Sequence, residues 1–118
     1  MENNRFERCL LLDFYGELLT EKQRRCCDLH FNEDLSLGEI AEQLGISRQG
    51  VWDNIRRGES TLQEIETKIG LIRRFLQTRA QLDGVSAKLD RLIALSSGEA
   101  ETLAKEIADE VQKMKRES

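Results

Sequence analysis

The chain has 118 residues, and its 18 basic and 22 acidic side chains give a net charge of −4. This balance argues against a protein that coats nucleic acid nonspecifically, because such binding needs a basic surface, although it is compatible with a local basic patch. Proline is absent and aromatic residues make up 5% of the chain, which favours long amphipathic helices over a sheet. We therefore expect an all-α fold, in which one small domain carries a helical extension.

Several classes of site and location are disfavoured by the sequence. Cys9, Cys26 and Cys27 form no CxxC pair, and with His30 as the one histidine a zinc site would be hard to assemble. We expect the cysteines to be packing residues in a reducing cytosol. No P-loop or dinucleotide-binding glycine pattern occurs, so no cofactor, metal, small-molecule substrate or enzymatic activity is predicted. The sequence shows neither a signal peptide nor an apolar run of about 18 residues, so we expect a cytoplasmic protein with no membrane partner.

A first helix is predicted over residues 5–19. Apolar residues recur there with strict i, i+4 spacing, which indicates one helical face; these residues are Phe6, Leu10, Phe14 and Leu18. A second set widens the apolar face: Leu11, Leu12, Tyr15 and Leu19. We expect this helix to contribute to the core.

The next two helices are each predicted to begin at a capping box. In Thr20-x-x-Gln23 and in Ser36-x-x-Glu39, the hydroxyl can accept a hydrogen bond from a free backbone N–H of the first turn. The helix that begins after Ser36 is expected to end at Gly45, because a glycine readily adopts the left-handed conformation found at helix ends.

Residues 36–57, SLGEIAEQLGISRQGVWDNIRR, predict a helix-turn-helix. Ser47 is expected to cap the fourth helix, at about 47–57, whose N-terminal residues would face the DNA major groove. Asn54 occupies a position where many such motifs have an apolar residue, and we expect Ile55 to serve instead. The candidate DNA-binding residues are Ser47, Arg48, Gln49, Trp52, Asp53, Arg56 and Arg57.

These side chains suit two kinds of DNA contact. Arg48 can form two hydrogen bonds with guanine, and Gln49 can do the same with adenine. Arg56 and Arg57, at the end of the predicted helix, suit phosphates.

The residues after Gly58 change pattern, and we expect a domain over 1–58 followed by a helical, coiled-coil-like extension over 59–118. The extension opens with a 3, 4, 3, 4 spacing that is typical of a heptad seam, formed by Leu62, Ile65, Ile69, Ile72 and Leu76. This seam could pack back on the first helices or pair with a second copy. We expect the second arrangement, a homodimer.

The stretch from Leu11 to Arg57 resembles the YlxM-like family, small bacterial proteins encoded beside the signal recognition particle GTPase. The resemblance is carried by FYGELLTEKQ, by SLGEIAEQLGISRQGV after an acidic turn, and by the DNIRR end. It implies a wing-free helix-turn-helix similar to the sigma-factor domain that reads the upstream promoter element. It also implies DNA binding and a role in the signal recognition particle pathway.

Two functions are left open by the sequence. The first is a transcriptional regulator that binds DNA. The second is an accessory protein that binds the signal recognition particle protein or its RNA. The fourth helix is compatible with both, because Arg48 and Gln49 suit a reader of bases, whereas Trp52 suits a protein-binding helix.

Overall fold

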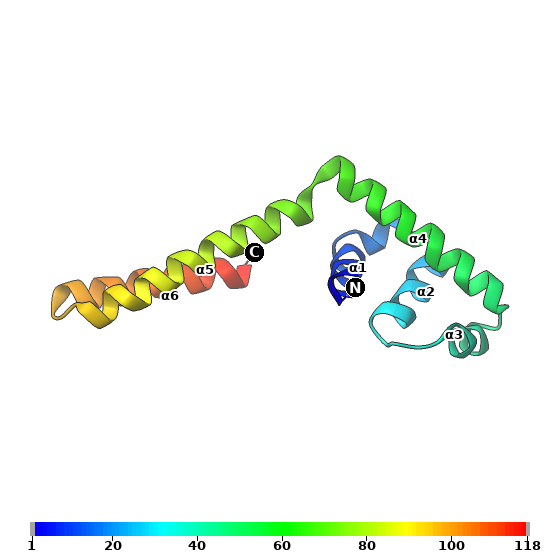
Figure 1. Ribbon diagram of the computed structural model, residues 1–118, viewed down its shortest axis with the longest axis horizontal. Coiled ribbons are helices and arrows are strands. Elements are labelled where there is room, and N and C mark those ends of the chain that lie inside the picture. Colours follow the sequence, from blue (N-terminus) through cyan, green and yellow to red (C-terminus); the bar gives the residue numbers. More distant parts are fainter. Residues whose placement is uncertain (1, 118) are drawn as a thin grey trace. The chain divides into compact units, whose positions relative to one another are not determined.

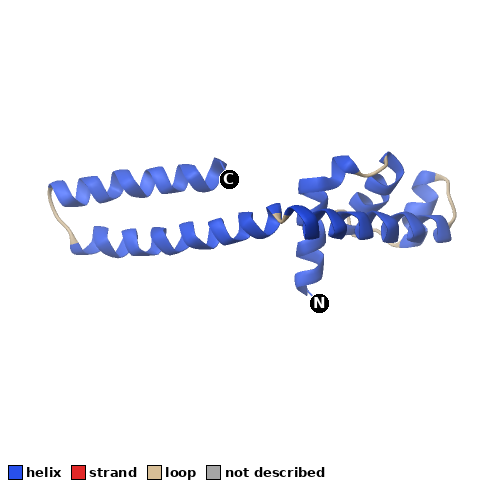
Figure 2. Ribbon diagram, turned by 90° about the horizontal axis from the view of Figure 1, so that it is seen from above, coloured by secondary structure: helices blue, strands red, loops and turns tan. Residues whose placement is uncertain are grey.

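The computed structural model describes residues 2–117, and side chains from residue 5 onward. Within these residues the chain is all-helical, as predicted, with short connections between the helices (Figures 1 and 2). The elements are α1 (Glu2–Tyr15), a 3-10 turn η1 (Gly16–Leu18), α2 (Glu21–Phe31), α3 (Leu37–Leu44), α4 (Arg48–Ile69), α5 (Leu71–Leu95) and α6 (Glu99–Glu117). They form two compact units, Met1–Ile72 and Arg73–Ser118. No helix in the described part of the chain combines the length and apolar character needed to cross a membrane.

The N-terminal unit is built around α4, which packs against α1, α2 and α3 (Figure 1). Every helix of this unit contributes to one core. Its most deeply buried side chains, all with an exposed fraction of 1% or less, are Cys26, Cys27, Ile40, Val51 and Leu62. The cysteines are therefore packing residues, as predicted, and burial raises the pKa of the Cys27 thiol to about 12.

The first helix turns a different face to the core from the one that the i, i+4 series predicts. The series ends at two exposed residues, Phe6 and Leu18, with exposed fractions of 58% and 65%. Each i, i+4 step rotates about 40° around a helix, so a long series winds away from any single face. The core is formed instead by the residues expected only to widen that face: Leu11, Leu12, Tyr15 and Leu19.

Both predicted capping boxes are confirmed. The Thr20 hydroxyl accepts from the Gln23 backbone N–H at 3.2 Å, and the Gln23 side chain accepts in return from the Thr20 backbone N–H. The Ser36 hydroxyl likewise accepts from the Glu39 backbone N–H at 3.1 Å, and the Glu39 carboxylate accepts from the Ser36 backbone N–H at 2.9 Å. These pairs satisfy backbone donors that have no partner within the first turn of a helix.

The fourth helix is longer than the sequence predicts, because it continues through Gly58 and ends at Ile69. Gly58 is buried, and a Cβ added to it would lie 2.9 Å from the Cys27 sulfur. The glycine thus permits α2 and α4 to approach closely and does not end the helix. The first compact unit accordingly extends to Ile72, beyond the predicted boundary at Gly58.

The predicted heptad seam does not lie on one helix. Gly70 adopts a left-handed conformation, with φ of 67°, between the end of α4 and the start of α5. Leu62 and Ile72 are buried in the core of the N-terminal unit, and Ile65 packs against that core. The two remaining seam residues stay exposed on separate helices, Ile69 at 49% and Leu76 at 39%. The spacing therefore reflects packing within the chain at three of its five positions.

A hydrogen-bonded carboxylate joins α1 to the junction between α4 and α5. One oxygen of Glu66 accepts from the Tyr15 hydroxyl at 2.6 Å and from the Ile72 backbone N–H at 3.0 Å. The second bond satisfies a free donor in the first turn of α5. Burial and the neighbouring carboxylate raise the pKa of Tyr15, which keeps the hydroxyl protonated as the donor.

The C-terminal unit is a hairpin of α5 and α6, which lie side by side in both ribbon views (Figures 1 and 2). Its small core contains Leu82 and Leu89 from α5 and Val111 from α6, with Ala108 packed against them. At the open end of the hairpin, the Lys115 ammonium lies 2.7 Å from the Asp83 carboxylate.

Candidate nucleic-acid interface

The turn between α3 and α4 has the geometry of a helix-turn-helix. Gly45 ends α3 in the left-handed conformation, with φ of 67°, and a Cβ there would be strained. Ser47 then caps α4 by accepting from the Gly50 backbone N–H at 3.0 Å. The predicted turn glycine and helix cap are both confirmed.

The inner face of α4 is fixed by packing. Val51 is fully buried and Ile55 nearly so, opposite the fully buried Ile40 of α3. Asn54 is partly buried, and its side-chain amide donates to the Gly50 carbonyl at 2.8 Å. Ile55 therefore takes the core position, as expected, while Asn54 satisfies its polar group within its own helix.

The outer face of α4 brings most of the predicted DNA-binding residues together. Successive residues are rotated by about 100° around a helix axis, and opposite sides of the helix are about 180° apart. By this geometry, Gln49, Asp53 and Arg56 lie on the side of α4 that faces away from the buried residues. Six of the seven predicted residues are exposed: Ser47, Arg48, Gln49, Trp52, Arg56 and Arg57. The exception is Asp53, which is half-buried, and the exposed Ser47 hydroxyl is engaged in the cap.

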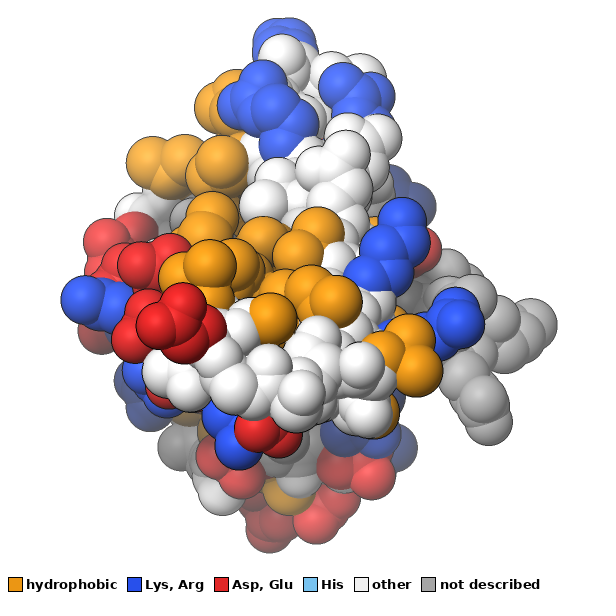
Figure 3. Space-filling view, turned by 90° about the vertical axis from the view of Figure 1, so that its left-hand side faces the viewer, with side chains coloured by type: hydrophobic (Ala, Val, Ile, Leu, Met, Phe, Trp, Pro, Cys, Tyr) orange, Lys and Arg blue, Asp and Glu red, His pale blue; other side chains and the backbone are white. Residues whose placement is uncertain are grey.

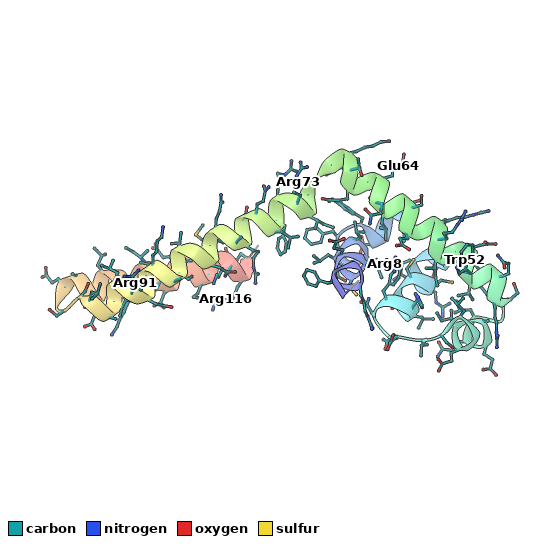
Figure 4. All side chains as sticks on the ribbon, in the orientation of Figure 1. Arg8, Trp52, Glu64, Arg73, Arg91 and Arg116 are labelled. Carbon is teal, nitrogen blue, oxygen red and sulfur yellow. The ribbon has the colours of Figure 1, made fainter. Side chains whose placement is uncertain are left out.

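Two pairs of side chains on this face constrain one another. The Gln49 amide donates to the Asp53 carboxylate at 3.2 Å. The Arg56 guanidinium lies 5.0 Å from the centre of the Trp52 ring, which is a cation–π contact. Trp52, labelled on α4 in Figure 4, remains 44% exposed. The second contact holds an arginine over an aromatic surface without neutralising its charge.

Arg48 lies apart from the other arginines, against the first turn of α3. A Cβ added to Gly38 would come within 3.1 Å of the Arg48 guanidinium, so glycine leaves room for that group. The concavity here is also lined by Glu39 and Glu42. Hydrogen bonds from Ser36 lower the pKa of Glu39, which therefore keeps its negative charge close to Arg48.

The arginines of this face are not neutralised inside the protein. Among the side chains that the structure describes, no ion pair involves Arg48, Arg56 or Arg57. The nearby Glu59, by contrast, is paired with Arg8 at 2.6 Å. The outer face of α4 therefore presents uncompensated positive charge on a chain that is acidic overall.

Two basic residues of α2 lie exposed beside α3, and the sequence reasoning missed them. Lys22 and Arg25 are exposed and line a concavity that also includes Glu21 of α2 and Leu44 of α3. A second concavity is lined by Gln23 of α2 together with Arg56, Arg57, Ser60 and Thr61 of α4. The run KQRR at 22–25 is the signal that could have identified the basic edge of α2.

Comparison with known proteins identifies the family. Residues 2–101 match the family described as "Putative helix-turn-helix protein, YlxM / p13 like". The chain belongs to this family. The match extends from α1 into α6 and so covers most of both compact units.

Relatives in the YlxM/p13-like family share substantial identity with this chain. A UPF0122 protein of Acetivibrio thermocellus is 58% identical over 74 residues, which is 63% of each chain. A UPF0122 protein of Thermoanaerobacter sp. strain X514 is 42% identical over 107 residues, 89% of this chain and 91% of the relative. One of Bacillus thuringiensis is 44% identical over 104 residues, 88% of this chain and 90% of the relative. These names state no activity, so a function has to be argued from the site.

Proposed function

We propose that this protein is a DNA-binding regulator that places the outer face of α4 against the major groove. The observation that carries the proposal is the uncompensated charge of Arg56 and Arg57, which are exposed on α4 and line a concavity that contains no carboxylate. DNA phosphates would supply the missing negative charges, and binding would release their condensed counterions.

The arginines suit different contacts. Arg56 and Arg57 line a concavity with hydroxyl and amide groups and no carboxylate, which suits a phosphate. Arg48 shares its concavity with two carboxylates, which would repel a phosphate, so we assign it to a base edge. Gln49 is positioned by Asp53 and would present its remaining amide atoms to a neighbouring base.

The test is a binding titration with duplexes that the purified chain enriches from a random pool. We expect the Kd to rise steeply with salt. Arg56→Ala should weaken binding to enriched and unrelated duplexes alike and reduce the log–log salt slope by about 1.

Arg91→Ala is the matched control, because it removes the same charge from an exposed position on α5. It should leave both the affinity and the salt slope unchanged. Absence of any enriched duplex would contradict DNA binding. Equal binding by the parent and Arg56→Ala would remove Arg56 from the interface.

A second candidate function is favoured by one feature of the same face. Trp52 exposes 44% of its surface, and exposed tryptophans are enriched at protein–protein contacts. On this alternative, α4 binds the signal recognition particle protein or its RNA as an accessory factor. Nuclease-treated and untreated pull-downs, followed by titration with each purified component, separate the two functions. A nuclease-resistant complex that Trp52→Ala abolishes would favour the alternative.

We also propose that the protein acts as a homodimer. Two copies would present two recognition helices, ideally about 34 Å apart, to successive major grooves of one duplex. The seam predicted from the sequence is poorly suited to this role, because Leu62 and Ile72 are buried in the core of the N-terminal unit. The contact between copies has to involve another surface.

A further inference from the structure

The hairpin of α5 and α6 exposes more apolar side chains than its own core buries. Its described buried side chains are Leu82, Leu89, Ala104 and Val111. Five larger apolar side chains outside that core are 38–57% exposed, and we name this set the hairpin face: Val85, Leu92, Leu103, Ile107 and Met114. A two-helix hairpin with so small a core gains stability if a further helical layer covers it.

The members of the hairpin face lie on one side of the hairpin. At 100° per residue, Val85 and Leu92 lie about 60–80° to one side of Leu82 on α5. On α6, Leu103, Ile107 and Met114 lie about 60–100° from Ala104 in the same rotational sense. Because the two helices are antiparallel, equal rotations from facing core positions lead to the same side. Figure 3 looks onto the loop end of the hairpin, where hydrophobic side chains gather.

The two edges of this face carry opposite charge. Between residues 73 and 95, α5 has five basic and two acidic side chains, whereas α6 has four basic and six acidic ones. The outer edge of the hairpin face on α5 includes Arg74 and Lys88. The corresponding edge on α6 includes Glu106, Glu110 and Glu117. A surface with one basic and one acidic edge is complementary to itself after a two-fold rotation.

We propose that a second copy of this chain docks on the hairpin face, with α5 of each copy against α6 of the other. This arrangement makes a four-helix bundle whose two-fold axis runs parallel to the helices. The alternative two-fold arrangement would place the basic α5 against its own copy and repel it. The inference rests on the homodimer proposed above and is independent of DNA binding.

The register of the hairpin identifies a charge pair between the copies. The Lys115 ion pair with Asp83, and the Arg79 hydrogen bond to the Lys115 carbonyl at 3.2 Å, fix which residues of α5 and α6 lie level. Counting from these contacts along antiparallel helices places Lys88 level with Glu106 and Glu110. Among the described side chains none of these three residues has an ion pair. In the dimer, Lys88 of each copy would meet the two glutamates of the other.

The test measures the mass of the full-length chain in solution without DNA, by sedimentation and light scattering. One chain is 13.6 kDa, and we expect twice that mass at micromolar concentration. Leu103→Glu should raise the dimer dissociation constant by at least about a hundredfold, because it buries a charge in both copies. Leu18→Glu is the matched control, since Leu18 is 65% exposed on the N-terminal unit and should leave the mass unchanged.

A second set of variants exchanges the charges of Lys88 and the two glutamates, and it tests the proposal even if Leu103→Glu unfolds the hairpin. Lys88→Glu should weaken the dimer by roughly tenfold, because each copy loses one attraction and gains a repulsion. Adding Glu106→Lys and Glu110→Lys should restore most of the affinity, and circular dichroism should be unchanged throughout. A parent protein with the mass of one chain would overturn the proposal. So would a dimer that the charge exchange does not affect, or one that Ile69→Asp or Leu18→Glu dissociates.

Discussion

Gly58 shows, at the scale of a single residue, how a small side chain can be required within a long helix. A Cβ added to Gly58 would lie 2.9 Å from the Cys27 sulfur. The absence of that atom lets α2 and α4 pack closely. The sequence suggested a domain boundary at this glycine, because the spacing of apolar residues changes after it. Only the contact with another helix distinguishes a glycine that ends a helix from one that permits packing.

We expect Gly58→Ala to lower the free energy of unfolding by about 1–2 kcal/mol, because overpacking costs about 1–3 kcal/mol and the gain in helix propensity offsets up to ~1 kcal/mol. Gly84→Ala is the matched control in α5, since nothing lies within 4 Å of its added Cβ. It should raise the free energy of unfolding by about 0.5–1 kcal/mol. Urea denaturation of both variants measures these changes.

A double substitution tests the stated cause. With Cys27→Ala the sulfur is gone, and the nearest atoms to the Cβ at position 58 lie 3.5 Å away, which is ordinary contact. Gly58→Ala should then cost less than it does in the parent protein. An equal cost in both backgrounds would show that the Cys27 contact does not explain the glycine.

At the scale of elements, local signals predicted the helix-turn-helix well. The caps at Thr20, Ser36 and Ser47 and the glycine turn at Gly45 are formed by residues close in sequence, so their outcome depends little on the rest of the fold. The expectation that Ile55 would take the core position in place of Asn54 was also correct. The candidate site could therefore be largely assembled from the sequence, although its function is still a proposal.

The errors at this scale arose where distant segments decide the outcome. The i, i+4 series of α1 could not show which edge of a wide apolar face meets α2 and α4. The heptad spacing over 62–76 could not show that Leu62 and Ile72 are buried by the N-terminal helices. The basic edge formed by Lys22 and Arg25 was also missed, because those residues precede the motif in sequence and approach it only through packing.

We proposed that Arg48 contacts a base edge whereas Arg56 contacts a phosphate, and this difference predicts an effect on base preference. Arg48→Ala should weaken binding to the enriched duplex by about 1–3 kcal/mol and relax selection at one base pair. Binding to unrelated duplexes should change little, in contrast to Arg56→Ala. Repeating the enrichment from a random pool with the Arg48→Ala protein measures this change in base selection directly. If base preference stays intact while all affinities fall together, Arg48 contacts the phosphate backbone instead.

At the scale of the whole molecule, the two compact units have separate proposed tasks. The N-terminal unit, Met1–Ile72, carries the candidate DNA-binding face, and the C-terminal unit, Arg73–Ser118, carries the hairpin face proposed to join two copies. Variants of α4 should leave the mass of the dimer intact. Loss of the dimer should in turn weaken DNA binding, because two recognition helices would no longer share one duplex. Leu103→Glu should thus alter mass, and Arg56→Ala should not.

The central claim is that the outer face of α4 contacts DNA, and an NMR titration tests it most directly. Backbone amide signals of the full-length chain are followed as an enriched duplex is added. We predict that the largest shifts fall on residues 47–57, with smaller ones on 22–25, and that residues 99–117 change little. Shifts confined to α5 and α6, or none at all on α4 while the duplex is bound, would contradict the account.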